Sequence, residues 1–245
     1  MEDVSTITIN HRKIPFELKR SSKANRLRLQ IKSDEPRLVL TAPRWVLGIQ
    51  IDRFLEAQSD WIEKHWDKLE KQVKRRPKPT YKAGDTFYYF GEVVTLSLIP
   101  SSSWKPSIRV RGNLLEIFLH RDITKSEGLK AAKKAVEEFY KAKASEVIHD
   151  RLQHFNQHYT LAYKRVTFRN QKTRWGSCSS AKNLNFNWRL IMAPIEVIDY
   201  VVVHELCHLG QMNHSKKFWA LVGETHLDYV NMKKWLKENQ YLLSI

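Results

Sequence analysis

Two histidines and a glutamate stand at a spacing that could bind and use a metal ion. His204, Glu205 and His208 form the pattern H-E-x-x-H at the end of an apolar run that predicts a helix. Residues four apart lie on one face of a helix, so both imidazoles could reach a single ion. Glu205 could then take a proton from a water molecule on the metal without binding the metal itself. The pattern therefore predicts a zinc site (Zn2+) with Glu205 as the general base.

A catalytic zinc ion usually has three protein ligands and one open position. His214 lies six residues after His208, and continued helix would rotate it by about 600°, away from the ligand face. Gly210 predicts the end of the helix, because glycine readily takes the left-handed conformation that terminates helices. The resulting spacing, H-E-x-x-H-x5-H, equals that of the metzincins, although their glycine would fall at Gln211. We therefore expect His204, His208 and His214 to be the zinc ligands.

Other residues that could bind a metal have a weaker pattern. His154 and His158 are also four apart, but no glutamate follows His154 and no acidic residue lies between them or after them as far as residue 195. We expect a surface or packing role for this pair. Cys207 lies between the two ligand histidines and should point away from them, as an inert buried thiol. Cys178 is not expected to bind metal.

The positive charge of the chain is concentrated near these motifs. The net charge is +16, from 42 Lys and Arg against 26 Asp and Glu, and residues 151–195 contain no Asp or Glu at all. An excess of this kind attracts anions such as nucleotides, nucleic acids or acidic proteins. Two interpretations remain open: a solvated basic face, or an anion-binding surface beside the metal, with Arg174 and Lys172 nearest to it.

Hydrophobic periodicity predicts an α+β fold. Period-two alternation or buried apolar runs predict strands, and turn residues separate them, at 14–18, 27–31, 38–40, 87–98, 108–119, 165–168 and 184–190. Helical spacing predicts one long helix at 51–73, another at 125–158, and helices through the last fifty residues. Pro194 and Glu196 suit the first turn of the helix that carries the H-E-x-x-H motif. We expect a β-rich N-terminal region with one long helix at 1–122 and a catalytic region at 123–245.

Composition sets broad limits on the class of protein. The chain is 42% hydrophobic and 11% aromatic, which is typical of a folded globular protein. We see no signal peptide, and no apolar run reaches the roughly 18 residues that a membrane span requires. Two cysteines fit a reducing compartment, so a cytoplasmic location without membrane partners is expected. The oligomeric state stays open.

Further motifs lie on both sides of the histidines. They are K-T-R-W-G-S-C at 172–178, N-W-R-L at 187–190, N-H-S at 213–215 and F-W at 218–219, with W-I-E-K at 61–64 and F-G-E at 90–92 upstream. Together with H-E-x-x-H, this set resembles the YgjP-like metallopeptidases, which are relatives of the SprT-like and WLM metalloproteins. The resemblance covers most of the chain.

The resemblance implies a zincin-like C-terminal half with an H-E-x-x-H active-site helix. It also implies zinc bound by His204, His208 and His214, with Glu205 as the base. Its implication for the substrate is weaker, because the family is named peptidase by analogy with neighbouring families. A nucleoside triphosphate pyrophosphatase activity, notably on UTP, has also been attached to it.

The segment Trp175–Cys178 has two interpretations. It could be structural, with Trp175 as a core anchor and Gly176 permitting a tight turn. Alternatively, this segment and the strand through Asn187 could form a wall of the cleft over the zinc, where Arg174, Lys172 and Arg189 contact an anionic substrate. We expect a mixture, in which Trp175 is structural and Arg174 binds substrate.

Three functions remain open. A metallopeptidase would polarise a peptide carbonyl and hold its substrate along a strand edge at 184–188. A nucleotide pyrophosphatase would use the same site on phosphorus, with basic residues neutralising the oxyanions. A nucleic-acid-associated protease of the SprT-like kind is the third, although no nucleic-acid module and no phosphate-binding G-x-x-x-x-G-K-[ST] loop is present. The sequence thus predicts a zinc hydrolase, metallopeptidase-like, and leaves its substrate open.

Overall fold

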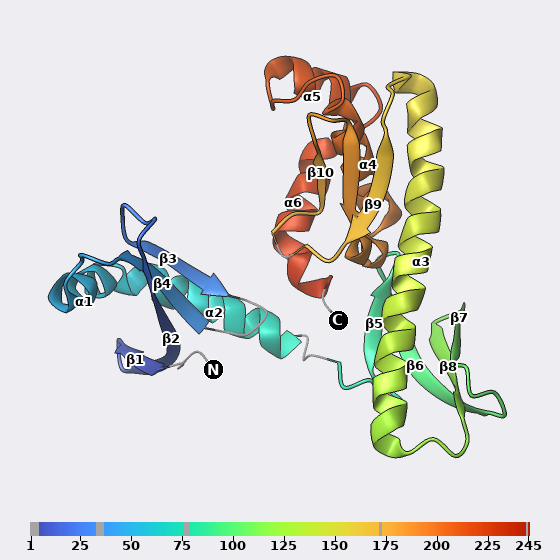
Figure 1. Cartoon of the computed structure of the whole chain (residues 1–245), viewed down its shortest axis with the longest axis horizontal. Helices are drawn as coiled ribbons and strands as arrows, with labels where there is room; N and C mark the ends of the chain where they lie inside the picture. Colours follow the sequence, from blue (N-terminus) through green and yellow to red (C-terminus); the bar gives the residue numbers. More distant parts are fainter. Residues whose placement is uncertain (1–4, 33–36, 76–78, 172, 244) are drawn as a thin grey trace. The chain divides into compact units, whose positions relative to one another are not determined.

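The computed structural model describes residues 5–32, 37–75, 79–171, 173–243 and 245 (Figure 1). These form a mixed α+β structure, as the sequence predicts. The chain divides into two compact units, residues 1–77 and residues 78–245, and each is described by itself. None of the helices in the described ranges is long and apolar enough to cross a bilayer.

The first unit is a four-stranded sheet with two helices. Its strands follow the order β1-β2-β4-β3, in which only β2 and β4 run parallel. Alternating apolar residues of β2 and β4, such as Ile14 and Leu40, are buried with Ile62 and Trp66 of the second helix. The strands predicted at 14–18, 27–31 and 38–40 are confirmed. The elements are β1 (Ser5–Ile9), β2 (Arg12–Ser21), β3 (Arg28–Lys32), β4 (Arg37–Pro43), α1 (Gly48–Ala57) and α2 (Ser59–Arg75).

The helix predicted at 51–73 is interrupted once. Gln58 separates α1 from α2, and its φ of −103° and ψ of 7° lie outside the α-helical range. The residues that follow, Ser59 and Asp60, are of types that favour the first turn of a helix. Leu55 and Ile62 are nevertheless both buried. Apolar spacing therefore continues across the break, which is why periodicity alone does not reveal it.

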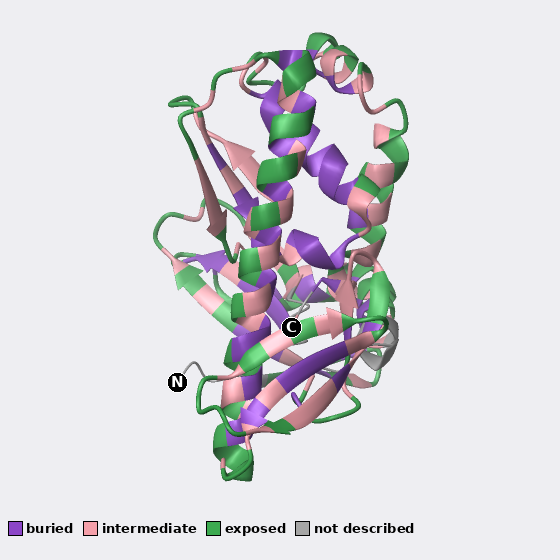
Figure 2. Cartoon of the chain, turned by 90° about the vertical axis from the view of Figure 1, so that its right-hand side faces the viewer, coloured by how far each residue is buried: buried purple, intermediate pink, exposed green. Residues whose placement is uncertain are grey.

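A second four-stranded sheet opens the second unit, in the order β5-β6-β8-β7, and α3 packs against it. One side of α3 is buried along its length and the other is exposed (Figure 2). The strands predicted at 87–98 and 108–119 are confirmed as two hairpins, and the helix predicted at 125–158 is confirmed. The elements are β5 (Thr86–Tyr89), β6 (Glu92–Ser101), β7 (Ser107–Arg111), β8 (Leu114–His120) and α3 (Lys125–Tyr159).

The boundary between the compact units differs from the division expected at residues 122 and 123. The structure places it after Pro77, so β5–β8 belong with the helices that follow them. The reason is burial: Phe87 and Leu115 of the sheet share one hydrophobic core with Val136 and Tyr140 of α3. Sequence patterning reveals which residues are buried, but not which surface buries them.

The rest of the second unit combines a three-stranded sheet with short helices. The sheet order is β10-β11-β9. The strand predicted at 165–168 is confirmed, whereas the one predicted at 184–190 ends at Asn187, whose side chain accepts a hydrogen bond from Arg189 N (3.1 Å) and caps a 3-10 helix. The elements are β9 (Arg165–Arg169), β10 (Gly176–Cys178), β11 (Asn183–Asn187), η1 (Trp188–Met192), α4 (Ile195–Cys207), α5 (Lys216–Gly223), α6 (Tyr229–Asn239) and η2 (Gln240–Leu242).

The turn between β5 and β6 fixes the approach to α4. Phe90 N donates to Ile191 O (2.9 Å), and Gly91 N donates to Met192 O (3.0 Å). Gly91 has φ of +82°, and a Cβ added to it would lie 2.8 Å from Pro194 Cγ. Glycine is therefore required here both for its backbone conformation and for close contact with the residue that precedes α4.

We predict that Gly91→Ala lowers the free energy of unfolding by about 2–4 kcal/mol, since left-handed strain and overpacking add together. Gly112→Ala is the matched control. Gly112 also has positive φ, at +58°, but nothing lies within 4 Å of its added Cβ, so a loss of about 1 kcal/mol is expected. Urea denaturation measures both variants. Equal losses of unfolding free energy in the two variants would show that the contact of the added Cβ with Pro194 does not destabilise the protein.

Candidate metal centre

His204 and Glu205 lie in the last turn of α4, and His208 caps it. α4 follows Pro194 at the N-cap position, has Glu196 in its first turn, and ends at Cys207 with His208 as its cap. Most of its residues are buried, including the run Val201–Val203. A helix enclosed in this way holds its side chains in fixed positions, which a metal site requires.

The three predicted histidines meet at one point. His204 Nε2 lies 3.2 Å from His208 Nε2 and 3.1 Å from His214 Nε2. One ligand nitrogen from each lies within 4.8 Å of the others. A tetrahedral ion with nitrogen ligands at 2.0–2.1 Å, such as zinc, separates them by about 3.3 Å. The donor set and its spacing therefore fit a divalent metal ion.

The chain turns toward His214 in a way that differs from the prediction. Gly210 was expected to take the left-handed conformation, but the glycines with positive φ are Gly84, Gly91 and Gly112. The helix instead tightens at its end, where Leu209 N donates to Leu206 O (2.9 Å) and Gln211 N donates to Cys207 O (2.8 Å). Hydrogen bonds make this turn, so the conformational freedom of glycine is not needed.

Neighbouring groups orient the imidazoles. His208 Nδ1 lies 3.1 Å from Gln211 O, which can accept its proton and leave Nε2 as the free donor of an electron pair. The Tyr200 hydroxyl lies 3.5 Å from His204 Nδ1. Phe218 is fully buried and stacks on His208 with ring centroids 4.5 Å apart. These contacts direct the ring nitrogens toward one another.

His204 and His208 are held in the neutral form that binds metals. Burial lowers the pKa of His204 to about 3, and the neighbouring charges of His208, His214 and Lys233 act in the same direction. Burial is also the main reason for the lowered pKa of His208. Protons therefore do not compete for the electron pairs of these two residues near neutral pH.

Glu205 lies in an apolar environment beside the histidines. It is 4% exposed, and within the described ranges its Oε2 has no hydrogen-bond partner. Burial raises the pKa of this carboxyl to about 8, while the positive charge of Arg174 acts to lower it. A divalent cation nearby would favour the ionised form further. Such a carboxylate can accept a proton from a water molecule.

Gly176 of β10 makes room for this carboxylate. A Cβ added to Gly176 would lie 2.5 Å from Glu205 Oε1 and 2.6 Å from Glu205 Cγ, closer than any two such atoms can approach. Sequence reasoning explains Gly176 by a tight turn, but its φ is not positive. Its function is the close approach of strand and side chain, for which the sequence carries no separate signal.

The predicted substrate contacts separate in the structure. Arg174 is exposed and lies near enough to Glu205 to influence its charge. Asn187 is 2% exposed, and its amide donates to Gln171 O (2.7 Å), so it holds the preceding loop and does not face a substrate. The Arg189 guanidinium lies over the Trp188 ring, 5.5 Å from its centroid. Lys172 lies outside the described residues.

The strand edge predicted at 184–188 is not an edge. β11 is the central strand, paired with β10 on one side and β9 on the other. The outer edge beside Glu205 belongs to β10. The main chains of Trp175 and Ser179 bond to β11, so by alternation those of Gly176 and Cys178 point outward. A one-dimensional pattern cannot reveal strand order, because order depends on contacts between distant segments.

Two aromatic residues and a lysine complete the surroundings of the site. Trp219 stacks on His214 (5.6 Å between centroids) and on Tyr229 of α6 (4.9 Å). Lys233 Nζ lies 4.8 Å from the Trp219 centroid, is exposed, and forms no ion pair within the described ranges. Sequence reasoning missed Lys233 and Tyr229, because only the packing of α6 brings them to the histidines.

Tertiary contacts pair some of the basic residues near the histidines with acidic residues that are distant in the sequence. No acidic residue was expected beside His158, but its Nε2 lies 2.9 Å from Glu224 Oε2, because α3 ends next to α5. Arg151, at the start of the acid-free run, is paired with Asp199 at 2.5 Å. Cys207 is fully buried, and burial raises its pKa to about 12, as expected of an inert thiol.

The comparison with known families defines the class of the protein. The model of the YgjP-like metallopeptidase domain matches residues 25–239. The class is that of metallopeptidases, which are hydrolases, and membership implies a divalent metal ion. The chain belongs to the YgjP-like family.

Two solved structures are similar to part of the chain. They are the metallopeptidase zymogens abylysin of Pyrococcus abyssi and jannalysin of Methanocaldococcus jannaschii, each 20% identical and covering 38% of this chain and 95% of their own. The TM-scores of 0.35 and 0.30 are too low to support an argument about this site. No curated protein matches the chain.

We predict that the purified protein binds about one divalent ion per chain, the usual complement of a three-histidine site. His214→Ala should lose most of it, because two histidines remain. His154→Ala should keep it, because that ring lies on Phe155, 4.9 Å between centroids. Elemental analysis after zinc loading measures both. Equal metal in wild type and His214→Ala would remove His214 from the ligand set.

Proposed function

We propose that this protein is a zinc-dependent peptidase with His204, His208 and His214 as ligands and Glu205 as the general base. The observation that carries the proposal is the convergence of the three imidazoles beside a buried carboxylate. His204 Nε2 lies 3.2 Å from His208 Nε2 and 3.1 Å from His214 Nε2. Family membership supports the same reaction class. The combination also supports a zincin-like catalytic region within residues 123–245.

Each residue has a separate task in this proposal. A zinc ion in this site would polarise the scissile carbonyl and lower the pKa of a water molecule. Glu205 would accept a proton from a water molecule beside it and pass that proton to the leaving amine. The apolar surroundings of Glu205 strengthen this acid–base role, because they keep its pKa near the working pH. Gln211 O holds His208 in place at 3.1 Å from its Nδ1.

The outer edge of β10 is our proposed docking site for the peptide. An extended substrate could pair with the main-chain groups of Gly176 and Cys178, and main-chain pairing binds peptides with little regard to their sequence. Since Gly176 contacts Glu205 directly, a peptide on this edge would pass the general base. This proposal replaces the docking edge predicted at 184–188.

An anionic substrate is the second candidate, and two exposed cations favour it. Arg174 lies near Glu205 and Lys233 near His204, and neither forms an ion pair within the described ranges. A nucleoside triphosphate such as UTP, or a protein bound to nucleic acid as for the SprT-like relatives, would meet these charges. Attraction of this kind is screened over about 10 Å at 0.1 M salt.

We predict that Glu205→Gln lowers peptide turnover by about 10²–10⁴-fold while zinc content stays unchanged. The amide has nearly the same shape but cannot accept the proton. Glu196→Gln, an exposed position in the first turn of the same helix, is the matched control and should keep full activity. Turnover of a casein-type substrate by zinc-loaded protein is the measurement.

The same preparations decide between the two candidates. Assays with nucleoside triphosphates across a salt series should show no Glu205-dependent release of pyrophosphate if the protein is a peptidase. Salt-sensitive pyrophosphate release, lost in Glu205→Gln, together with no peptide cleavage would make the nucleotide the substrate. Full activity of zinc-loaded Glu205→Gln would mean that another residue is the base.

We predict that Gly176→Ala lowers turnover by about 10²-fold with zinc retained, because the new Cβ displaces Glu205 and misplacement by about 1 Å has that effect. Gly210→Ala is the matched control on the other side of the histidines. The nearest atoms to its added Cβ are 3.8 Å away, an ordinary contact, so its activity should equal that of the wild type. A fully active Gly176→Ala would show that the position of Glu205 does not limit the reaction.

A further inference from the structure

The third histidine lies on a different element from the first two. His204 and His208 belong to α4 and its cap, whereas His214 precedes Ser215, the N-cap of α5. The distance between His214 Nε2 and His204 Nε2 therefore depends on how α5 is held against α4. Phe218 fixes the N-terminal end of α5, because it is fully buried and contacts all three imidazoles.

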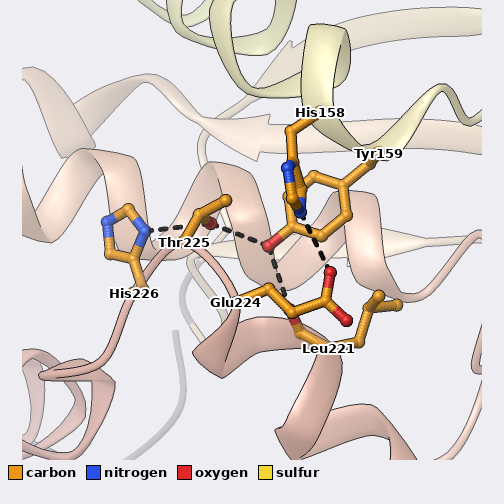
Figure 3. A network of polar contacts seen from close by, with 6 residues as sticks. All are labelled: His158, Tyr159, Leu221, Glu224, Thr225 and His226. Atoms are coloured by element: carbon orange, nitrogen blue, oxygen red, sulfur yellow. Dashed lines mark hydrogen bonds and ion pairs between the residues drawn. The ribbon is translucent and has the colours of Figure 1, made fainter.

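A tyrosine from the end of α3 holds the other end of α5. The Tyr159 hydroxyl donates to Leu221 O (3.0 Å) and lies 2.7 Å from Thr225 Oγ1. Figure 3 shows this hydroxyl between the two groups, with His158 and Glu224 beside them. Leu221 belongs to the last turn of α5, and Thr225 follows it. One side chain therefore binds the helix end and the loop that leaves it.

The helix that carries Tyr159, α3, also packs against α4. Tyr159 is buried in the same hydrophobic core as Cys207, the residue before His208. Tyr159 is 8% exposed, and burial raises its pKa well above the ordinary value, so the hydroxyl stays protonated and available as a donor. It therefore ties the end of α5, the element after the third histidine, to α3, which packs against the element that carries the other two.

Other contacts in this region are weaker restraints. The ion pair of His158 and Glu224 is about half exposed at both partners, and exposed pairs of this kind contribute little. Thr225 Oγ1 lies 3.5 Å from His226 Nδ1, which is long for a hydrogen bond. The buried hydroxyl is therefore the main polar restraint in this network.

We propose that Tyr159 is a positioning residue for the metal site: its hydroxyl sets α5 against α4 and so sets the distance of His214 from His204 and His208. This inference rests on the proposed function, since it assumes that the three histidines bind one ion. Tyr159 does not touch the ion. It acts through the end of α5 and through the packing of α3 against α4, and it lies over 60 residues along the chain from Leu221.

Tyr159→Phe tests the inference, because it keeps the buried ring and removes only the hydroxyl. Zinc affinity, measured by competition with a chelator, should fall by about tenfold to a hundredfold, the usual effect of losing a group that orients metal ligands. The rise in melting temperature on adding zinc should shrink accordingly. A purely structural role would lower the melting temperature but leave zinc affinity unchanged.

Tyr140→Phe is the matched control. Tyr140 is also fully buried on α3, and its hydroxyl donates to a carbonyl, Tyr88 O at 2.8 Å, but Tyr88 belongs to β5, which contributes no histidine to the cluster. Its zinc affinity should equal that of the wild type. If Tyr159→Phe and Tyr140→Phe bind zinc equally well, the positioning role is overturned.

Two further variants keep the test decisive. If Tyr159→Phe does not fold, Thr225→Val provides a milder change, because it removes one partner of the hydroxyl and leaves its bond to Leu221. A smaller loss of zinc affinity is then expected. Unchanged zinc affinity in Thr225→Val would overturn the inference. His214→Ala separates this result from the proposed function. Wild-type zinc affinity in His214→Ala would mean that the proposed metal site itself is wrong, whatever Tyr159 does.

Discussion

His204 Nε2 lies 3.1 Å from His214 Nε2 and 3.2 Å from His208 Nε2, and so close an arrangement depends on neutral rings at His204 and His208. Burial supplies that condition by lowering the pKa of His204 to about 3 and by lowering that of His208. Charged rings at these distances would repel one another strongly. The enclosure of α4 by the surrounding core is thus an electrostatic requirement of the site as well as a packing arrangement.

The same enclosure has an opposite effect on the carboxylate. Burial raises the pKa of Glu205 to about 8, so ionising it in this environment is unfavourable without a nearby positive charge. Gly176 allows β10 to lie directly against this side chain, which fixes its position. The site therefore places the neutral imidazoles of His204 and His208 beside a carboxylate whose ionisation is unfavourable. A divalent cation would bind the imidazoles and would favour the ionised carboxylate.

Fewer exposed positive charges surround the site than the composition of residues 151–195 indicates. The acid-free run at 151–195 does not form a uniform positive surface, because tertiary contacts neutralise part of it. Arg151 is paired with Asp199, whereas Arg174 remains exposed beside Glu205. Lys233, outside the run, adds a second cation near His204. An anionic group on a substrate would meet these two residues and not the stretch as a whole.

The sequence alone determined what is set within a few residues: the i, i+4 pair on α4, the break before His214, and most strands and helices from their apolar periods. Tertiary structure decided the rest. It broke the helix at Gln58, placed β11 in the centre of its sheet, and brought Tyr159 to Leu221 across 62 residues of chain. Periodicity records which side of an element is buried. The partner that buries it is chosen by contacts between distant segments, which leave no local pattern.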